Sequence, residues 1–182
     1  MLAGAEPWSD QRVASLRGQI SERLDGGTSD EPGVTFGLGG VVTELDDLHL
    51  SYRQALMAAR AADLVSSFSP FAKWVDLGPY QLLLRMNSSD IAAVSSVPAL
   101  QALEAADHHD ILLDSLECYL DNAGDVRRAA SIAFVHRATF YQRLKRIEEV
   151  TGCDLASGSD RLMLHLALKI RALATGNGTL GR

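Results

Sequence analysis

The chain contains few cysteines and no long apolar run. Cys118 and Cys153 are its only cysteines, too few for a disulfide framework and not spaced as a metal-binding pair. No apolar run reaches the roughly 18 residues of a membrane span, and no basic segment followed by an apolar one opens the chain. Neither a membrane span nor a secretory signal is therefore indicated. With 47% hydrophobic residues, we expect a folded cytoplasmic protein with no membrane contact.

Side chains with catalytic or metal-binding potential lack the neighbours that either role requires. His108 and His109 have no cysteine or third histidine nearby, so we expect them at a helix boundary rather than in a metal site. Serine, histidine and aspartate are present without a nucleophile elbow. The sequence therefore predicts no enzyme activity, no bound metal and no cofactor.

Acidic residues are missing from one segment of an otherwise acidic chain. The formal net charge of the 182 residues is −6. Residues 1–110 hold 7 Lys and Arg against 15 Asp and Glu, whereas residues 111–182 hold 10 against 8. Between Val126 and Ile147 there are six Lys and Arg and no Asp or Glu. A local basic zone in an acidic chain is typical of a regulator whose DNA-reading module is one part of the protein.

Two short helical patterns occupy this basic zone. In the first, small apolar residues recur at helical spacing, at Val126, Ala129, Ala130 and Ala133. In the second, larger ones recur at Phe140, Leu144, Ile147 and Val150. About three residues around Val135 separate the patterns, and two helices joined so tightly must cross steeply. The segment 124–152 therefore predicts a helix-turn-helix.

The outer face of the second helix mixes cations with polar groups. If Phe140 faces inward, a helical wheel turns outward Ala138, Gln142 and Lys145. The flanks of that face then carry Thr139, Tyr141 and Arg146. Cations suit phosphates, and Gln and Arg can also pair with base edges in a major groove. A basic helix face is often only solvated, so the residues by themselves leave DNA contact and a plain solvated face both open.

Residues 1–86 have the pattern of a small, partial α+β domain. Ser9 can cap an amphipathic helix that ends at Gly26, with apolar positions at Val13, Leu16, Ile20 and Leu24. Short strands are predicted at residues 34–38 and 73–76, with a helix over 45–64 between them and a helical turn over 80–86 after them. The sheet-facing side of the 45–64 helix is expected to hold Leu48, Tyr52, Ala55, Leu56 and Ala59.

The carboxyl-terminal part is predicted to be helical. Residues 87–110 are expected to form a helical linker. A strong helix follows and stops at residues 122–124, with apolar positions at Leu112, Leu113, Leu116, Tyr119 and Leu120. Ser157 and Asp160 can form a capping box for a last helix, with apolar positions at Leu162, Leu166, Leu168 and Leu173. We expect the tail at residues 176–182 to be disordered.

The carboxyl-terminal part contains LLDSLECYLDNAGDVRRAASIAFVHRATFYQRLKRIEEVTGCDL and, after a gap, DRLMLHLALKIRAL. Together, over about residues 111–173, these stretches closely resemble the carboxyl-terminal helix-turn-helix domain of the PucR/CdaR family of bacterial transcription regulators. The family has an asparagine or a similar residue where this chain has Ala138, and a second tyrosine where it has Gln142. Because both departures lie on the outward face, they bear on the operator sequence rather than on the fold.

The amino-terminal part contains FGLGG, LDDLHLSYRQALMAARAA and WVDLGPYQLLLRM within residues 34–86. These stretches resemble the degenerate GGDEF-like domain that precedes the DNA-binding part in this family. GGDEF relatives include nucleotide cyclases, which need a metal-binding carboxylate pair beside a glycine-rich signature. No acidic residue directly follows FGLGG, and Asp46 and Asp47 fit a helix-capping role. Nucleotide cyclisation is therefore not expected.

The resemblance implies a sequence-specific DNA-binding transcription regulator that controls a catabolic operon, of the type that responds to purine degradation products or sugar diacids. It implies a mostly α fold: a partial GGDEF-like α+β domain at 1–86, a helical linker at 87–110, a helical bundle with the helix-turn-helix at 111–175, and the tail. The implied partners are double-stranded DNA and a second copy of the chain. We expect the effector to be sensed by a domain absent from this chain, which would then be the carboxyl-terminal portion of a longer regulator.

The helix over about 137–150 is expected to lie in the major groove, with His136 and Arg137 nearest the bases. By resemblance, base and phosphate contacts would be shared by Thr139, Tyr141 and Gln142, beside Ala138. The phosphate candidates are Arg128, Arg143, Lys145 and Arg146. The alternative is a protein-interaction module whose amino-terminal part self-associates and whose basic helix docks an acidic partner. Heparin and random duplex would compete with a DNA-binding surface but not with an apolar groove partner.

Overall fold

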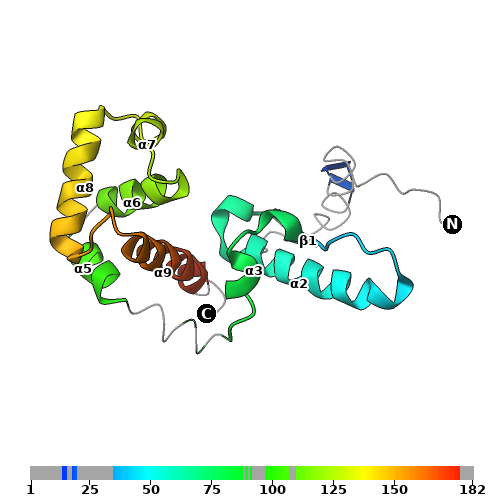
Figure 1. Ribbon diagram of the computed structural model, residues 1–182. Helices are drawn as coiled ribbons and strands as arrows, with labels where there is room; N and C mark the ends of the chain where they lie inside the picture. The colour runs from blue at the N-terminus through cyan, green and yellow to red at the C-terminus, as the bar shows by residue number, and fades with distance from the viewer. Residues whose placement is uncertain are drawn as a thin grey trace, which may run out of the picture. The chain divides into compact units, whose positions relative to one another are not determined.

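The computed structural model describes residues 35–87, 97–106 and 110–176, together with positions 14, 15, 18, 19, 89 and 91. Its elements are mostly helices, with one small parallel sheet among the described residues, which confirms the predicted fold class. The chain divides into two compact units between Arg85 and Met86 (Figure 1). Apart from four positions, the predicted helix at 9–24 lies outside the described residues, as do His108, His109 and the tail from 177 onward.

The amino-terminal unit is built on one parallel strand pair. Strand β1 (Phe36–Leu38) pairs with β2 (Phe71–Lys73) so that Phe36 lies opposite Phe71. Parallel strands need a crossover connection, and helix α2 (Leu48–Leu64) provides it. The short helical turns around these elements are η1 (Leu45–Asp47), η2 (Ser66–Phe68), η3 (Trp74–Asp76) and α3 (Tyr80–Leu83).

The second strand begins earlier than the predicted 73–76. Residues 74–76 form the turn η3 instead, and the strand occupies 71–73. Trp74 is buried, and its carbonyl oxygen accepts a hydrogen bond from Gln81 Nε2 at 2.7 Å. That carbonyl therefore has a partner outside the strand ladder, and the pairing with β1 ends at Lys73.

Glycines let β1 lie directly against α2. A Cβ on Gly37 would overlap the carbonyl oxygen of Ala55 and the amide nitrogen of Ala59. Ser51 Oγ donates to the carbonyl oxygen of Gly40 at 2.7 Å and ties the helix to the end of the strand. The strand and the helix can therefore approach each other only where both carry small residues.

The packing face of α2 differs from the predicted one. Ala58 and Ala61 are fully buried, whereas Leu48, Tyr52 and Leu56, predicted to face the sheet, are 54%, 65% and 53% exposed. The physical reason is the close approach at β1, which leaves room for alanines but not for larger side chains. The prediction for these three side chains was wrong.

Over residues 97–106 and 110–176 the carboxyl-terminal unit is built mainly of helices. Its helices are α5 (Pro98–Ala106), α6 (Ile111–Asp121), α7 (Val126–Ile132), α8 (Arg137–Thr151) and α9 (Gly158–Gly176). Helix α8 packs on α5, α6 and α7, while α9 packs on α5 and α6 (Figure 1). The unit is thus a bundle in which α8 has one side covered by three helices.

One hydrophobic cluster fills this bundle. Phe140 and Ile147 of α8 are fully buried in it, together with Leu116 of α6. Leu100 and Leu103 of α5 belong to the same cluster, although the sequence assigned α5 to a linker. Two of the four apolar positions predicted for α9, Leu168 and Leu173, are buried, whereas Leu162 and Leu166 are exposed. The buried residues that α9 contributes to the cluster are Leu164, Ala167 and Leu168.

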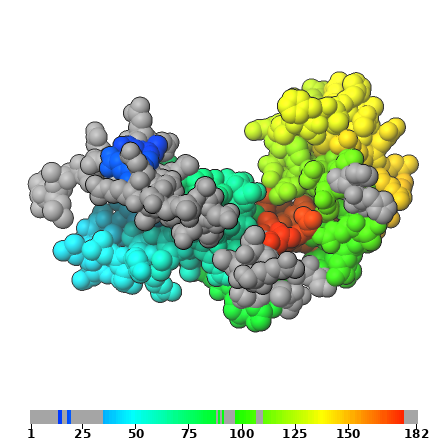
Figure 2. All heavy atoms as spheres, turned by 180° about the vertical axis from the view of Figure 1, so that it is seen from behind, coloured from blue at the N-terminus to red at the C-terminus, as the bar shows by residue number. Residues whose placement is uncertain are grey.

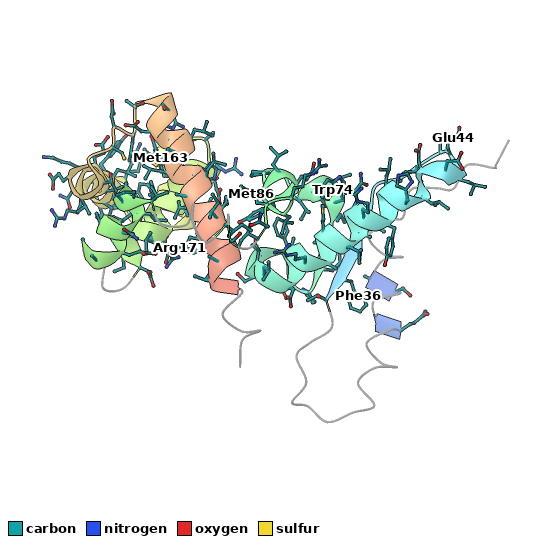
Figure 3. The ribbon with its side chains drawn as sticks, turned by 90° about the horizontal axis from the view of Figure 1, so that it is seen from below. Phe36, Glu44, Trp74, Met86, Met163 and Arg171 are labelled. Atoms are coloured by element: carbon teal, nitrogen blue, oxygen red, sulfur yellow. The ribbon has the colours of Figure 1, made fainter. Side chains whose placement is uncertain are left out.

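Charged side chains join α6 to α9. Lys169 Nζ lies 3.0 Å from Glu117 and 2.9 Å from Asp121, and His165 Nε2 lies 2.7 Å from Asp121. Burial alone would raise the pKa of Asp121 and lower that of Lys169, but their mutual hydrogen bonds and opposite charges outweigh it. The pKa of Asp121 is therefore lowered, and that of Lys169 is raised. Arg171, labelled in Figure 3, belongs to the same helix and donates to Glu104 of α5 at 2.6 Å.

Within the part of the chain that the structure describes, no helix has the length and apolar character to cross a membrane. The same residues contain no group of three or more His, Cys, Asp and Glu side chains placed to hold a metal ion.

Candidate nucleic-acid interface

Helix α7 begins at a side-chain cap. Asp125 Oδ1 accepts hydrogen bonds from the backbone nitrogens of Arg127 at 2.9 Å and Arg128 at 3.1 Å, which satisfies two amides of the first turn. Ala129 and Ala130 are buried against the bundle. The cap and the alanines fix α7 with both arginine side chains exposed.

The turn between α7 and α8 is closed by two backbone hydrogen bonds. The nitrogen of Val135 donates to the carbonyl oxygen of Ala130 at 3.0 Å, and that of Phe134 donates to Ser131 at 3.2 Å. This is the Schellman arrangement, in which the residue after the helix cap takes a left-handed conformation. Phe134 occupies that position, with φ at 53°. Four residues, 133–136, separate the helices, and the turn has a fixed shape.

His136 caps the amino terminus of α8. Its Nδ1 accepts a hydrogen bond from the backbone nitrogen of Ala138 at 3.2 Å. In the neutral ring this assigns the proton to Nε2, which can donate outward. The predicted base-proximal residue therefore has one ring nitrogen engaged in the fold and the other at an exposed helix end.

The two faces of α8 are oriented as predicted. Phe140, Leu144 and Ile147 are buried. The opposite side is exposed, and it holds Arg137, Ala138, Thr139, Tyr141, Gln142, Lys145 and Arg146. Figure 2 shows α7 and α8, coloured yellow-green to yellow, at the surface of the carboxyl-terminal unit. The structure thus brings seven of the predicted site residues together on one helix face.

Arg143 is placed differently from the other predicted cations. Its side chain is half-buried, and Nη1 donates to Ser115 Oγ at 3.1 Å. Ser115 Oγ in turn donates to the carbonyl oxygen of Ile111 at 2.7 Å. The guanidinium group therefore connects α8 to α6 inside the unit.

The exposed charges around the turn are nearly all positive. Arg127 and Arg128 on α7 and Arg137 and Lys145 on α8 are exposed, and no acidic residue occurs between 126 and 147. Arg146 has an ion pair with Glu149 at 3.4 Å, but both side chains are at least half exposed, so water screens it. A hollow of about 340 Å³ lies at the turn, lined by Arg127, Ala130, Ser131, Val135, His136 and Arg137.

Phe134 is a feature that sequence reasoning missed. It is 94% exposed and lies in the turn between the two helices that carry the exposed cations. The available signal was a large aromatic residue inside the short break where both helical patterns stop. Periodicity assigns no direction to a residue in such a break, so the wheel could not place it.

Both parts of the chain match known family models. Residues 112–170 match the model described as the PucR C-terminal helix-turn-helix domain. Residues 1–61 match the model described as a GGDEF-like domain. The first match spans α6, α7 and α8 and most of α9, so it contains the exposed face described above.

Curated relatives in Bacillus subtilis (strain 168) carry names of regulators. The proline-responsive transcriptional activator PutR is 30% identical over 141 residues, which is 75% of this chain and 34% of PutR. The DNA-binding transcriptional activator AdeR is 25% identical over 141 residues, 76% of this chain and 33% of AdeR. The purine catabolism regulatory protein is 21% identical over 173 residues, 95% of this chain and 33% of that protein. The chain spans about a third of the length of these relatives.

Proposed function

Since the chain belongs to the PucR family of transcriptional regulators, we propose that its carboxyl-terminal unit binds double-stranded DNA sequence-specifically, with α8 in the major groove. The observation that carries the proposal is the exposed face of α8, which is free of acidic residues from its start to Ile147 while Phe140 and Leu144 anchor the opposite face. A major groove is wide enough to admit one α-helix, and its flanking phosphates attract such a face.

The residues nearest the start of α8 would contact bases. Arg137 can donate two hydrogen bonds to a guanine, and Gln142 can pair with an adenine. His136 would donate from Nε2, since its Nδ1 is engaged in the helix cap. Ala138 is small and exposed, which leaves room for a base edge to approach the helix.

The remaining polar side chains would contact the backbone of the duplex. Lys145 and Arg146 on α8 and Arg128 on α7 supply positive charges. Hydroxyl groups for sugar or phosphate contacts come from Thr139 and Tyr141. We assign Arg143 a positioning role instead, because its hydrogen bond to Ser115 holds α8 against α6.

A dimer would provide the specificity that a single helix lacks. One recognition helix covers only a few base pairs, and two copies can bind paired half-sites.

We further propose that the DNA-binding domain includes α5, since Leu100 and Leu103 lie in its core cluster. The name of the purine catabolism regulatory protein supports control of a catabolic operon, and that of the proline-responsive activator PutR supports control by a small effector.

The proposed function is tested by fluorescence anisotropy with duplex from the promoter of the gene itself and a scrambled duplex, across about 50 to 200 mM salt. Binding should weaken steeply, with a logarithmic slope of about −0.9 for each phosphate neutralised. Arg137→Ala should cost about 1–3 kcal/mol and reduce the preference for the promoter sequence. Lys145→Ala should weaken both duplexes equally and flatten the slope by about 0.9.

Arg53→Ala is the matched control, because it removes the same charge from an exposed position of α2 in the other unit. It should leave both affinity and slope unchanged. Salt-insensitive binding, or no binding by a folded dimer, would overturn the proposal.

A second candidate function is self-association without DNA binding, and the exposed Leu48, Tyr52 and Leu56 on α2 favour it. They follow one another at intervals of four residues and so form a stripe on the helix. Sedimentation of a Leu48→Gln, Leu56→Gln double variant tests this candidate, which requires the variant to be monomeric. It also requires that heparin leaves the self-association of the wild type unaffected.

A further inference from the structure

Phe134 presents almost its whole ring to solvent. At 94%, its side chain is the most exposed of the large hydrophobic side chains that the structure describes. Its neighbour Val135 is half-buried and packs against the core cluster. Packing within the unit therefore accounts for Val135 but leaves the ring of Phe134 without a structural role.

The backbone at Phe134 is also unfavourable for phenylalanine. With φ at 53°, it takes the left-handed conformation that ends α7, a position that glycine usually fills because it has no Cβ. Glycine at this position would give the same turn with less backbone strain. Residues held in such conformations cluster at functional sites, which favours a contact between this ring and a binding partner.

The surroundings of Phe134 indicate what that contact is. His136 and Arg137 follow it by two and three residues, and Arg127 lines the hollow at the same turn. An apolar protein groove would have to desolvate these polar and charged groups, whereas DNA pairs cations with phosphates and also offers apolar groups beside them. Those groups are the methyl of thymine in the major groove, which phenylalanine is known to contact, and the deoxyribose carbons.

We propose that Phe134 is a DNA-contacting residue that packs its ring against thymine methyl or deoxyribose groups at the edge of the groove that α8 enters. The inference rests on the proposed function and adds an apolar contact to a surface otherwise made of cations and polar groups. Both amides of the turn, at Phe134 and Val135, are hydrogen-bonded to α7. The backbone that carries the ring therefore has a fixed shape before DNA arrives, which lowers the entropy lost on binding.

The decisive variant is Phe134→Gly, because it should affect folding and binding in opposite directions. Glycine relieves the left-handed strain, so the melting temperature should stay equal or rise. Loss of the apolar contact should weaken promoter binding about tenfold. The salt slope should remain that of the wild type, since no charge is removed. Phe134→Ala should show the same loss of affinity.

Two variants serve as matched controls. Ala123 takes the corresponding left-handed position at the end of α6, with φ at 54°. Ala123→Gly should therefore raise or preserve stability in the same way while leaving DNA affinity unchanged. Leu162→Ala removes an exposed apolar side chain from α9 and should also leave affinity unchanged.

Uracil in place of thymine distinguishes the two apolar groups. If Phe134 contacts a methyl, uracil at that position should weaken the wild type but not Phe134→Ala. If it contacts deoxyribose, uracil should affect both proteins equally while the loss from Phe134→Ala persists. Either pattern supports the inference.

Three outcomes overturn it. If the wild type binds DNA and Phe134→Gly binds it with the same affinity, this inference is refuted while the proposed function stands. If sedimentation shows that Phe134→Gly weakens the dimer enough to explain the loss of DNA affinity, the ring makes a protein contact instead. Absence of DNA binding by the wild type refutes the proposed function, and this inference with it.

Discussion

Helices α2 and α8 differ in the size of the side chains that they bury. Helix α2 buries alanines such as Ala58 and Ala61 and leaves Leu56 exposed. Helix α8 buries Phe140 and Ile147, and leaves Arg137, Gln142 and Lys145 exposed. In each unit the element that the helix packs against decides which side chains are buried: a glycine-containing strand for α2, and the side chains of three other helices for α8.

This comparison shows under which conditions a helical wheel identifies the buried face of a helix. On α8 the large apolar residues all lie on one side, so hydrophobic burial and available space select the same face. On α2 they compete, because Gly37 brings the strand so close that leucine cannot fit. The size of the side chain therefore overrides its hydrophobicity at this contact. Substitutions at the α2 contact and in α8 can test the two kinds of packing independently.

The largest expected effect is on the buried face of α8. Phe140→Ala should cost about 3–5 kcal/mol of unfolding free energy, because Phe140 is fully buried and the bundle cannot fill the space. Urea denaturation followed by circular dichroism measures it. Tyr141→Ala, which removes the neighbouring aromatic ring from the exposed face, should change stability by less than about 0.5 kcal/mol. Equal losses from both variants would contradict the assignment of faces.

Next in size is the contact between β1 and α2. Gly37→Ala should destabilise the amino-terminal unit by about 2–3 kcal/mol, because the added methyl overlaps backbone atoms of α2 that cannot move independently. Fluorescence of the buried Trp74 reports unfolding of this unit. Gly158→Ala is the control, since a Cβ there meets no atom within 4 Å. A Gly37→Ala variant as stable as wild type would refute the close approach.

A smaller effect is expected where α6 and α9 are joined by charges. Lys169→Met should cost about 1 kcal/mol near neutral pH, since Glu117 and Asp121 lose their partner but remain partly solvated. Because the pKa of Asp121 is lowered in the fold, its stabilisation is present above the ordinary carboxyl pKa of about 3.9 and is lost as the pH falls through the lowered value. The difference between variant and wild type should shrink over that range in denaturation curves at several pH values.

The smallest effect concerns the exposed side of α2. Tyr52→Gln should change the stability of the monomer by no more than about 0.5 kcal/mol, because the side chain is 65% exposed. Thermal melting at low protein concentration checks this. A loss above about 2 kcal/mol would mean that Tyr52 is covered by another part of the protein.

The sequence alone was sufficient for the helix-turn-helix. The small stripe of α7 and the large stripe of α8 each indicate one buried face, and the acid-free interval marks the outer one. It was insufficient where a contact between distant segments decides the outcome. The carbonyl contact of Gln81 with Trp74 shifts the end of the strand, and burial of Leu103 brings α5 into the core. Such contacts are tertiary and leave no local pattern.

Site-specific photo-crosslinking tests most directly which surface lies on DNA. A benzophenone amino acid placed at Gln142, on the outer face of α8, should crosslink to promoter duplex, and salt that releases the DNA should abolish the product. The same label at Leu162, which is also exposed but lies on α9, should give none. Crosslinking from position 162 with none from position 142 would contradict the account.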